Sequence, residues 1–105
     1  MIKLIALYRE PDDIEAFMDH YLNIHTPLVQ KVPGLEHLEV IRIDSNAFDE
    51  NTPPPYFLMC TMSYRDEETF NAAMRSPENR AAVKDAMSFA KDVMTVVVGN
   101  DILVQ

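Results

Sequence analysis

The stretch Tyr56-Phe-Leu-Met-Cys-Thr-Met-Ser-Tyr64 predicts a β-strand with large apolar side chains on both of its faces. Successive side chains of a strand point to opposite sides of a sheet, so these residues divide into two sets. One face carries more of them than the other (Tyr56, Leu58, Cys60 and Met62 against Phe57 and Met59). A sheet that contains this strand has to cover both faces, because monomers rarely expose an apolar patch above a few hundred Å².

The segments before this strand predict a strand and then a helix. Ile2 to Arg9 is rich in branched residues, which is typical of a strand buried on both faces. Asp12 and Glu15 predict a capping box at the start of the helix, and Pro33-Gly34 predicts its end. The apolar residues between these points have helical spacing and predict the face turned to the core: Ile14, Phe17, Met18, Tyr21, Ile24 and Leu28.

The remaining segments predict two strands and two helices. Leu35 to Asp44 predicts a strand, and the polar, proline-rich connection Ser45 to Pro55 follows it. The length of this connection suggests a functional flap, an arm that contacts a partner, or a surface insertion. Asp66–Phe70 predicts the start of one helix, and Ser76-Pro77-Glu78 predicts the cap of the next. The residues of this second helix that we expect to face the core are Val83, Ala86, Met87 and Ala90. The last strand is predicted at Thr95–Val98.

The order of these elements, β-α-β-β-α-β, defines the fold class. It predicts an α+β protein with the ferredoxin-like split βαβ arrangement and a four-stranded antiparallel sheet, in a single domain of residues 1–105. In this plan helices cover only one face of the sheet. We therefore expect a second copy to cover the other face, sheet against sheet, which makes a homodimer of the dimeric α+β barrel type.

Composition narrows the classes of partner and compartment. Lys and Arg total 9 against 17 acidic residues, a formal charge of −8, so neither nucleic acid nor an anionic membrane is an expected partner. No apolar stretch approaches the roughly 20 residues that span a bilayer. Met1 to Glu10 is too short and too soon charged for a signal peptide, and the single cysteine, Cys60, allows no intrachain disulfide. These features predict a soluble, cytoplasmic protein.

The best candidates for chemistry are His25 and Tyr21, which lie one helical turn apart and share a helix face. His25 is suited to act as a general base or acid near neutral pH, with Tyr21 as its hydrogen-bonding partner. Pro27 disfavours helical geometry at Thr26, which predicts a kink or a restart with Thr26 as N-cap. The alternative is that Tyr21 packs in the core and His25 binds the carbonyls that Pro27 leaves free.

Three further residues are candidates for binding a substrate. Tyr8 and Met62 can line an apolar pocket, although core packing explains Tyr8 equally well and explains Met62 without any ligand. His37 shares a strand face with Glu39 and can contribute a second imidazole if that face lines a cavity. The alternative for His37 is a salt contact at the edge of the sheet.

No metal site or nucleotide cofactor is expected. His20 and His25 are five residues apart, so on a regular helix they diverge and do not chelate a metal as an i, i+4 pair would. The chain has only two glycines, Gly34 and Gly99, and therefore no glycine-rich phosphate loop.

Four of these segments, in this order, resemble the EthD family, which is named for a protein of ethyl tert-butyl ether degradation. They are the strand Ile2–Arg9, the run from Tyr21 to His25-Thr-Pro-Leu28, Pro33-Gly34-Leu35, and the helix start Ser76-Pro77-Glu78. The resemblance covers essentially the whole chain. It implies a ferredoxin-like homodimer without metal or organic cofactor, in which the family's first-helix histidine corresponds to His25 and the preceding aromatic residue to Tyr21.

The activity that the resemblance implies is broad, because relatives in the superfamily include muconolactone isomerases, polyketide cyclases, cofactor-free aromatic oxygenases and haem-degrading enzymes. With these candidate residues we expect a cofactor-free acid/base enzyme of isomerase, cyclase or lyase type. Its substrate would be a small hydrophobic carbonyl or aromatic intermediate. The alternatives are a small-molecule binding protein that accompanies an oxygenase and a cofactor-free monooxygenase.

Overall fold

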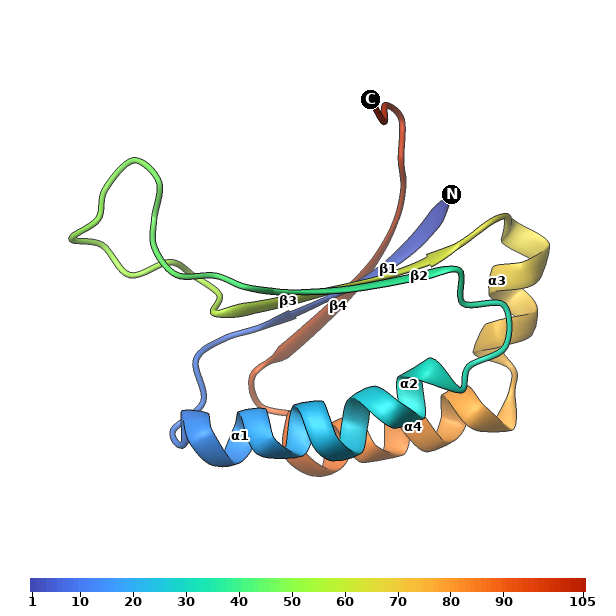
Figure 1. Cartoon of the computed structure of the whole chain (residues 1–105), viewed down its shortest axis with the longest axis horizontal. Coiled ribbons are helices and arrows are strands. Elements are labelled where there is room, and N and C mark those ends of the chain that lie inside the picture. Colours follow the sequence, from blue (N-terminus) through green and yellow to red (C-terminus); the bar gives the residue numbers. More distant parts are fainter.

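A four-stranded sheet lies against a layer of helices in the computed structural model of the chain, which describes residues 1–105 (Figure 1). The strands and helices follow the predicted order. The first helical segment consists of three parts, which the sequence pattern did not distinguish. The elements are β1 (Ile2–Tyr8), α1 (Ile14–His20), the π-helical turn η1 (Tyr21–His25), α2 (Thr26–Gln30), β2 (His37–Arg42), β3 (Leu58–Tyr64), α3 (Glu67–Met74), α4 (Pro77–Phe89) and β4 (Met94–Asn100).

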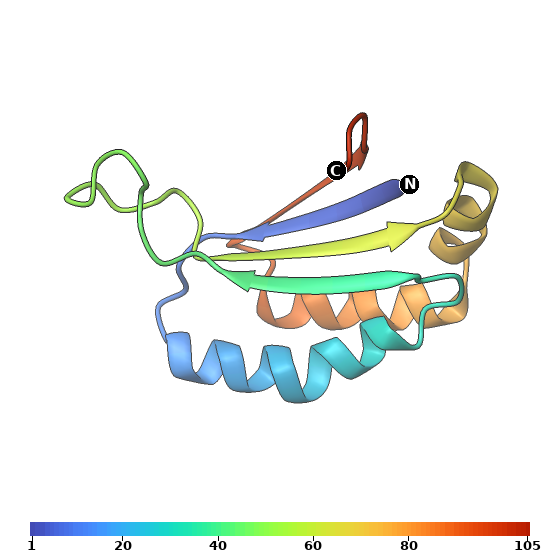
Figure 2. The ribbon, with the colours of Figure 1, turned by 45° about the horizontal axis from the view of Figure 1, so that its top comes forward.

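The sheet has the strand order β2-β3-β1-β4, and every neighbouring pair is antiparallel. β1 and β3 are therefore central, and β2 and β4 are the edges. The long α1–η1–α2 segment and α4 run side by side across one face (Figures 1 and 2). The predicted α+β, ferredoxin-like arrangement is confirmed.

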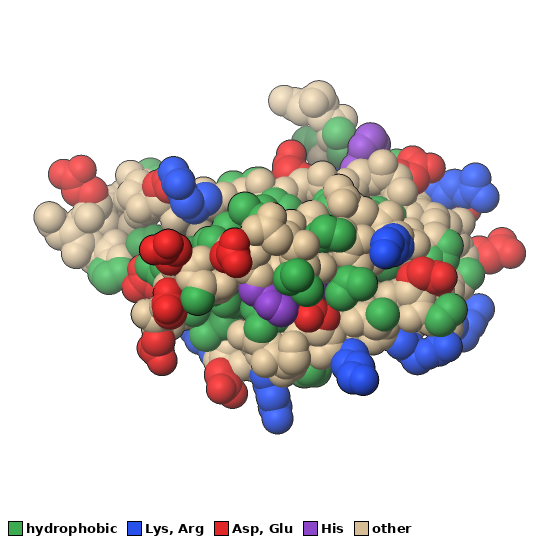
Figure 3. All heavy atoms as spheres, turned by 60° about the horizontal axis from the view of Figure 1, so that its bottom comes forward, with side chains coloured by type: hydrophobic (Ala, Val, Ile, Leu, Met, Phe, Trp, Pro, Cys, Tyr) green, Lys and Arg blue, Asp and Glu red, His purple; other side chains and the backbone are tan.

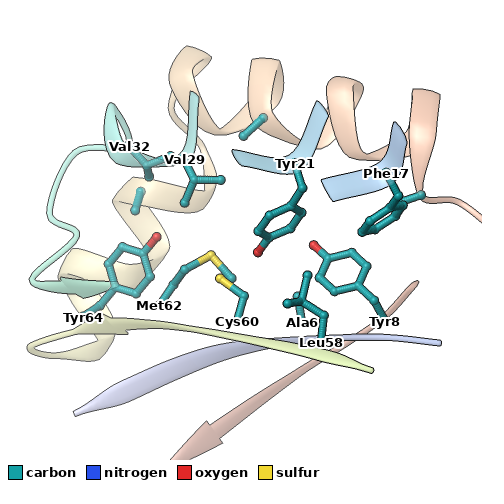
Figure 4. Packing of buried hydrophobic residues seen from close by; sticks show 13 residues of the cluster. Ala6, Tyr8, Phe17, Tyr21, Val29, Val32, Leu58, Cys60, Met62 and Tyr64 are labelled. Carbon is teal, nitrogen blue, oxygen red and sulfur yellow. The ribbon is translucent and has the colours of Figure 1, made fainter. Parts of the chain in front are cut away.

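The core lies between the central strands and the helices. Alternate residues of β3 point into it, so the predicted division of that strand is confirmed for Leu58, Cys60 and Met62 (Figure 4). Phe57 differs from its prediction, because it precedes the strand and its ring lies 5.5 Å from that of Phe17 on the helical side. Tyr8 packs edge-on against the ring of Phe17 as well, at 5.6 Å. Each such buried aromatic side chain stabilises the fold by roughly 1.5–3 kcal/mol.

The opposite face of the sheet is open in the single chain (Figure 2). Because Ala6 and Tyr8 of β1 point to the helices, Ile5 and Leu7 point away from them. Their cross-strand neighbours share this face: Met59 and Thr95 beside Leu7, and Thr61 and Val97 beside Ile5. This apolar surface is the one that a second copy is predicted to cover.

The first helix begins one residue later than predicted. Asp13, rather than Asp12, is the N-cap, and its carboxylate accepts a hydrogen bond from the Ala16 backbone amide at 3.0 Å. The predicted core-facing stripe is also wrong in part, since Ile14 and Ile24 are 44% and 51% exposed.

The π-helical turn η1 explains the displaced stripe. A π turn closes its hydrogen bonds from residue i to i+5, so it holds one residue more than an α-helical turn. The inward positions within and after it are Tyr21, His25 and Val29, four residues apart, and Ile24 turns outward. A hydrophobic pattern with a strict 3.6-residue period does not anticipate this shift.

The α-helix restarts at Thr26 and Pro27, as predicted, but Thr26 belongs to the helix and is not its N-cap. Thr26 has helical angles (φ −56°, ψ −43°), and both its backbone amide and its hydroxyl donate to the carbonyl of Tyr21. Proline lacks the amide that a regular helix needs, and its ring crowds the carbonyl four residues earlier. The wide turn directly before Pro27 relieves this conflict, so α1, η1 and α2 form one continuous helical segment, which bends at α2 (Figures 1 and 2).

The start of α4 was predicted correctly, whereas two of its inward positions were not. The Ser76 hydroxyl accepts from the Asn79 backbone amide at 3.1 Å, as a capping serine should. Ala86 and Ala90 are buried, but Val83 and Met87 are 47% and 52% exposed. They lie at the margin of the helical layer.

The connection between β2 and β3 projects beyond the end of the sheet and includes the fully exposed Phe48 (Figure 1). It lies away from the paired helices α1 and α4, so in this structure it is not a flap over them.

Gly34→Ala is expected to destabilise the chain by about 1–3 kcal/mol. Gly34 has φ +83°, and an added Cβ would lie 2.6 Å from Cγ2 of Thr69. Gly99→Ala is the matched control, because its nearest neighbour would be Ile5 Cδ1 at 4.0 Å. Urea unfolding measures both variants, and equal losses of free energy would contradict the role given to Gly34.

Candidate functional site

A cavity of about 300 Å³ lies between the sheet and the helices. Of the 16 residues that line it, 14 are hydrophobic, and the two others are His25 and Asn79. Val83 and Met87 of α4 and Val96 of the edge strand β4 belong to the lining and are about half exposed. The cavity therefore meets solvent between α4 and β4. Figure 3 shows hydrophobic side chains across the middle of the helical side of the molecule, with charged groups mostly toward its margins.

His25 is held at the cavity by one strong hydrogen bond. It comes from the end of η1, is only 6% exposed, and its Nδ1 lies 3.0 Å from Oδ2 of Asp85 on α4. With Asp85 ionised, this contact requires a proton on Nδ1, so in the neutral ring Nε2 carries the lone pair.

The Nε2 atom of His25 is free and accessible. No hydrogen bond within the chain uses it, and yet no side-chain nitrogen or oxygen is fully buried without a partner. His25 is also part of the cavity wall.

Asp85 also binds a second imidazole. Nε2 of His20, at the end of α1, lies 2.9 Å from Oδ1 and 3.0 Å from Oδ2 of the same carboxylate. The ring of Phe89 covers both histidines, with ring centres 4.2 Å from His20 and 5.3 Å from His25. The expectation that His20 and His25 diverge is wrong, because the π turn lies between them and turns both toward α4.

Burial lowers the pKa of His25 below its ordinary value of 6.5, and the hydrogen bond and charge of Asp85 oppose this effect without cancelling it. A positive charge on His20 lowers the pKa further. The ring of His25 is therefore neutral at pH 7, which is the form that can accept a proton.

The structure separates Tyr21 from the role of hydrogen-bonding partner to His25. The two rings are 5.6 Å apart, but the Tyr21 hydroxyl points toward Tyr8 and Cys60 in the core (Figure 4). Burial, the largest cause, raises the pKa of both tyrosines, so both hydroxyls stay protonated. Asp85 occupies the place that was predicted for Tyr21.

The three predicted substrate-binding residues are divided between the two faces of the sheet. Tyr8 and Met62 line the cavity together with His25. His37 is exposed on β2 and pairs with Ser63, on the open face and away from the cavity. Its predicted neighbour Glu39 shares that face and is exposed too.

Sequence reasoning missed Asp85 and the part that His20 plays. A signal for Asp85 existed, because it stands between Ala82 and Phe89 on the side of α4 that is otherwise apolar. A charged residue within such a stripe needs a buried partner.

The structure contains neither a cluster of metal ligands nor a helix that could span a membrane. No three His, Cys, Asp or Glu side chains are grouped so that they could hold a metal ion. No helix has the length and apolar character needed to cross a bilayer.

The strand order, the antiparallel pairing and the helices on one face define a ferredoxin-like α+β protein. The model of the EthD domain matches residues 9–92, so the chain belongs to the EthD family. The resemblance noted in the sequence is thereby confirmed.

Three known proteins illustrate this similarity. An EthD family protein from Bacillus halodurans has 44% identity and a TM-score of 0.90, covering 97% of this chain and 99% of its own. An 11.0 kDa protein encoded between thcB and thcC in Rhodococcus erythropolis is 30% identical over 97 residues, 92% of this chain and 91% of its own. A dimeric ferredoxin-like protein from Thermobifida fusca shares the fold, with 20% identity, a TM-score of 0.68, and coverage of 95% and 90%.

Proposed function

We propose that this EthD protein is an acid/base enzyme that moves protons on a small, uncharged, hydrophobic carbonyl or aromatic compound. One observation carries the proposal: an imidazole that is hydrogen-bonded to a carboxylate through one nitrogen, and unpaired at the other, forms part of the wall of an apolar cavity. A carboxylate on one ring nitrogen fixes the tautomer and stabilises the imidazolium that forms when the other nitrogen takes a proton.

The proton transfer uses side chains of this chain. His25 Nε2 removes a proton from the carbon beside a carbonyl, and the C–H electron pair becomes the enolate. The positive charge on His25 is stabilised by Asp85 through the Nδ1 hydrogen bond. Tyr64 is another cavity residue, and burial raises its pKa, so its hydroxyl remains a donor for the enolate oxygen. Return of the proton to a different atom completes an isomerisation. In a cyclisation the enolate carbon attacks a second carbonyl group of the same molecule, and the proton goes to the alkoxide that forms. In an elimination a leaving group departs from the carbon next to the enolate and takes up the proton.

The walls of the cavity favour an uncharged ligand. No Lys or Arg lines it, so a substrate carboxylate or phosphate would be buried without a partner. Its volume lies near the lower end of the roughly 300–1,000 Å³ that ligand pockets occupy, which suits a compact molecule.

We also propose that the functional form is a homodimer joined through the open face of the sheet. Ile5, Leu7 and Val97 on that face support this arrangement, and a dimer is the described state of the Thermobifida fusca protein of the same fold. Each chain would keep its own cavity, because the cavity lies on the helical side.

The protein is expected to accelerate exchange of the C–H protons beside the carbonyl of 2-tetralone, an uncharged bicyclic ketone, in D₂O. Val83→Trp should slow this exchange by about tenfold or more, equivalent to about 1.4 kcal/mol, because the indole covers the mouth of the cavity. Lys84→Trp, the adjacent exposed position outside the cavity lining, is the matched control. NMR follows the loss of the proton signal.

Two results would count against the proposal. Exchange no faster than with free imidazole at the same pH would show that the cavity supplies no catalytic base for this ketone class. Saturable binding of 2-tetralone without exchange would instead favour the small-molecule binding protein, the alternative from another functional class.

A further inference from the structure

The carboxylate of Asp85 forms hydrogen bonds with two histidines that come from different elements. Its carboxylate binds His20, at the end of α1, through both oxygens at 2.9 and 3.0 Å, and binds His25, at the end of η1, through Oδ2 at 3.0 Å. The side chain of His20 is 32% exposed, against 8% for His25 and 14% for Asp85. One imidazole therefore faces the cavity, and the other reaches solvent.

We propose that His20 is a positioning residue for the base His25. In this proposal, which depends on the function proposed above, His20 fixes the Asp85 carboxylate against His25. It also competes for the negative charge of that carboxylate whenever it is protonated.

The first part of the proposal follows from the geometry of the hydrogen bonds. A carboxylate with one partner can turn about its terminal torsion, which has broad minima. The His20 contact engages both oxygens of Asp85 and ties α4 to α1, so it restricts this rotation. The Oδ2 atom is thereby held in the direction of His25 Nδ1.

The second part follows from charge. Asp85 and His20 are the two charged groups that act on His25, and they act in opposite directions. On α1 the nearby Asp19 accepts a hydrogen bond from Asn23, whereas the carboxylate that pairs with His20 is Asp85. A positive charge on His20 repels a proton on His25 and therefore lowers the pKa of His25.

This coupling has a consequence for the base. While His20 is neutral, the negative charge of Asp85 stabilises only the protonated form of His25. Once His20 is protonated, its positive charge offsets part of this stabilisation, and His25 becomes a weaker base. The charge on a partly exposed side chain thus affects the proton affinity of a buried one.

The test uses His20→Gln, whose amide N–H can still bind Asp85 but does not titrate, and His20→Leu, which has neither property. NMR follows the imidazole C–H signals against pH. In the unchanged protein the His25 signal should move in two steps, because each ring responds to the other. In His20→Gln it should move in one step, displaced to higher pH. The signal of His37, on the other face of the sheet, should be identical in all proteins.

The exchange of 2-tetralone separates the positioning effect from the charge effect. Above the pH at which either ring takes a proton, His20→Gln should keep most of the rate, whereas His20→Leu should lose about 10- to 100-fold through misplacement of the carboxylate. An unchanged two-step titration in His20→Gln would overturn the competition for charge. Full activity of His20→Leu would overturn the positioning role.

The result is different if the proposed function itself is wrong. In that case neither the unchanged protein nor the His20 variants accelerate exchange of the ketone protons. The NMR titrations do not depend on turnover, so they still decide whether the two rings share Asp85 as inferred.

Discussion

His25→Gln is expected to lower the rate of 2-tetralone exchange by about 10²–10⁴-fold, which corresponds to about 3–5 kcal/mol of transition-state stabilisation. The glutamine amide can still donate to Asp85 and fills a similar volume, so the packing around α4 is kept. It cannot accept a proton at neutral pH, and the cavity wall holds no second imidazole. The substitution therefore removes the base and leaves the cavity in place.

The loss must appear in turnover and not in folding. Thermal unfolding and affinity for 2-tetralone should stay close to those of the unchanged protein. Lys31→Gln, at the exposed end of α2, serves as the control with an equal change to glutamine. An unchanged rate in His25→Gln would assign the proton transfer to another group, and the role of His25 would be lost.

Leu7→Glu is expected to convert the proposed dimer of about 24 kDa, twice the 12.0 kDa of one chain, into a monomer. Leu7 lies on the central strand β1, opposite Met59 and Thr95, on the open face of the sheet. A carboxylate buried there without a partner costs several kcal/mol, and each dimer would contain two. Light scattering at micromolar concentration measures the mass.

Two further variants distinguish the loss of the dimer from the loss of folding and from a general effect of an added carboxylate. Val97→Glu changes the same face at a position that is 45% exposed in the single chain, so it should leave folding of the monomer intact. Ile14→Glu introduces the same group on the helical side, where the side chain is similarly exposed, and it should remain dimeric. A mass of 12.0 kDa for the unchanged protein would contradict the sheet-to-sheet dimer.

Much of the fold was predictable because strands and caps depend on local residue patterns. The alternation in Leu58–Tyr64 placed the core face correctly, and Ser76 with Pro77 marked the start of α4. The register of the first helix was not predictable in the same way. It depends on a single π turn before Pro27, and the spacing of apolar residues does not reveal that this turn holds one residue more than an α-helical turn.

The candidate site was predictable only where its residues are close in the sequence. His25 was found because it stands in an unusual run before a proline, and the structure places it in the cavity wall. Asp85 lies 60 residues away and meets His25 only through the packing of α4 against η1. Tyr21 was assigned a partner role because it is a near neighbour in sequence, but packing turned its hydroxyl to Tyr8 and Cys60.

The extra residue in η1 also determines which spacings of the two histidines are compatible with this arrangement in homologues. Deleting one residue between His20 and His25 would restore a regular helix in which the two histidines lie four residues apart and still share a face. A homologue with that deletion would therefore keep both imidazoles on the side turned to α4. Among homologues, an interval of five residues with a π turn, or of four residues without one, would mark the proteins in which both histidines can bind one carboxylate.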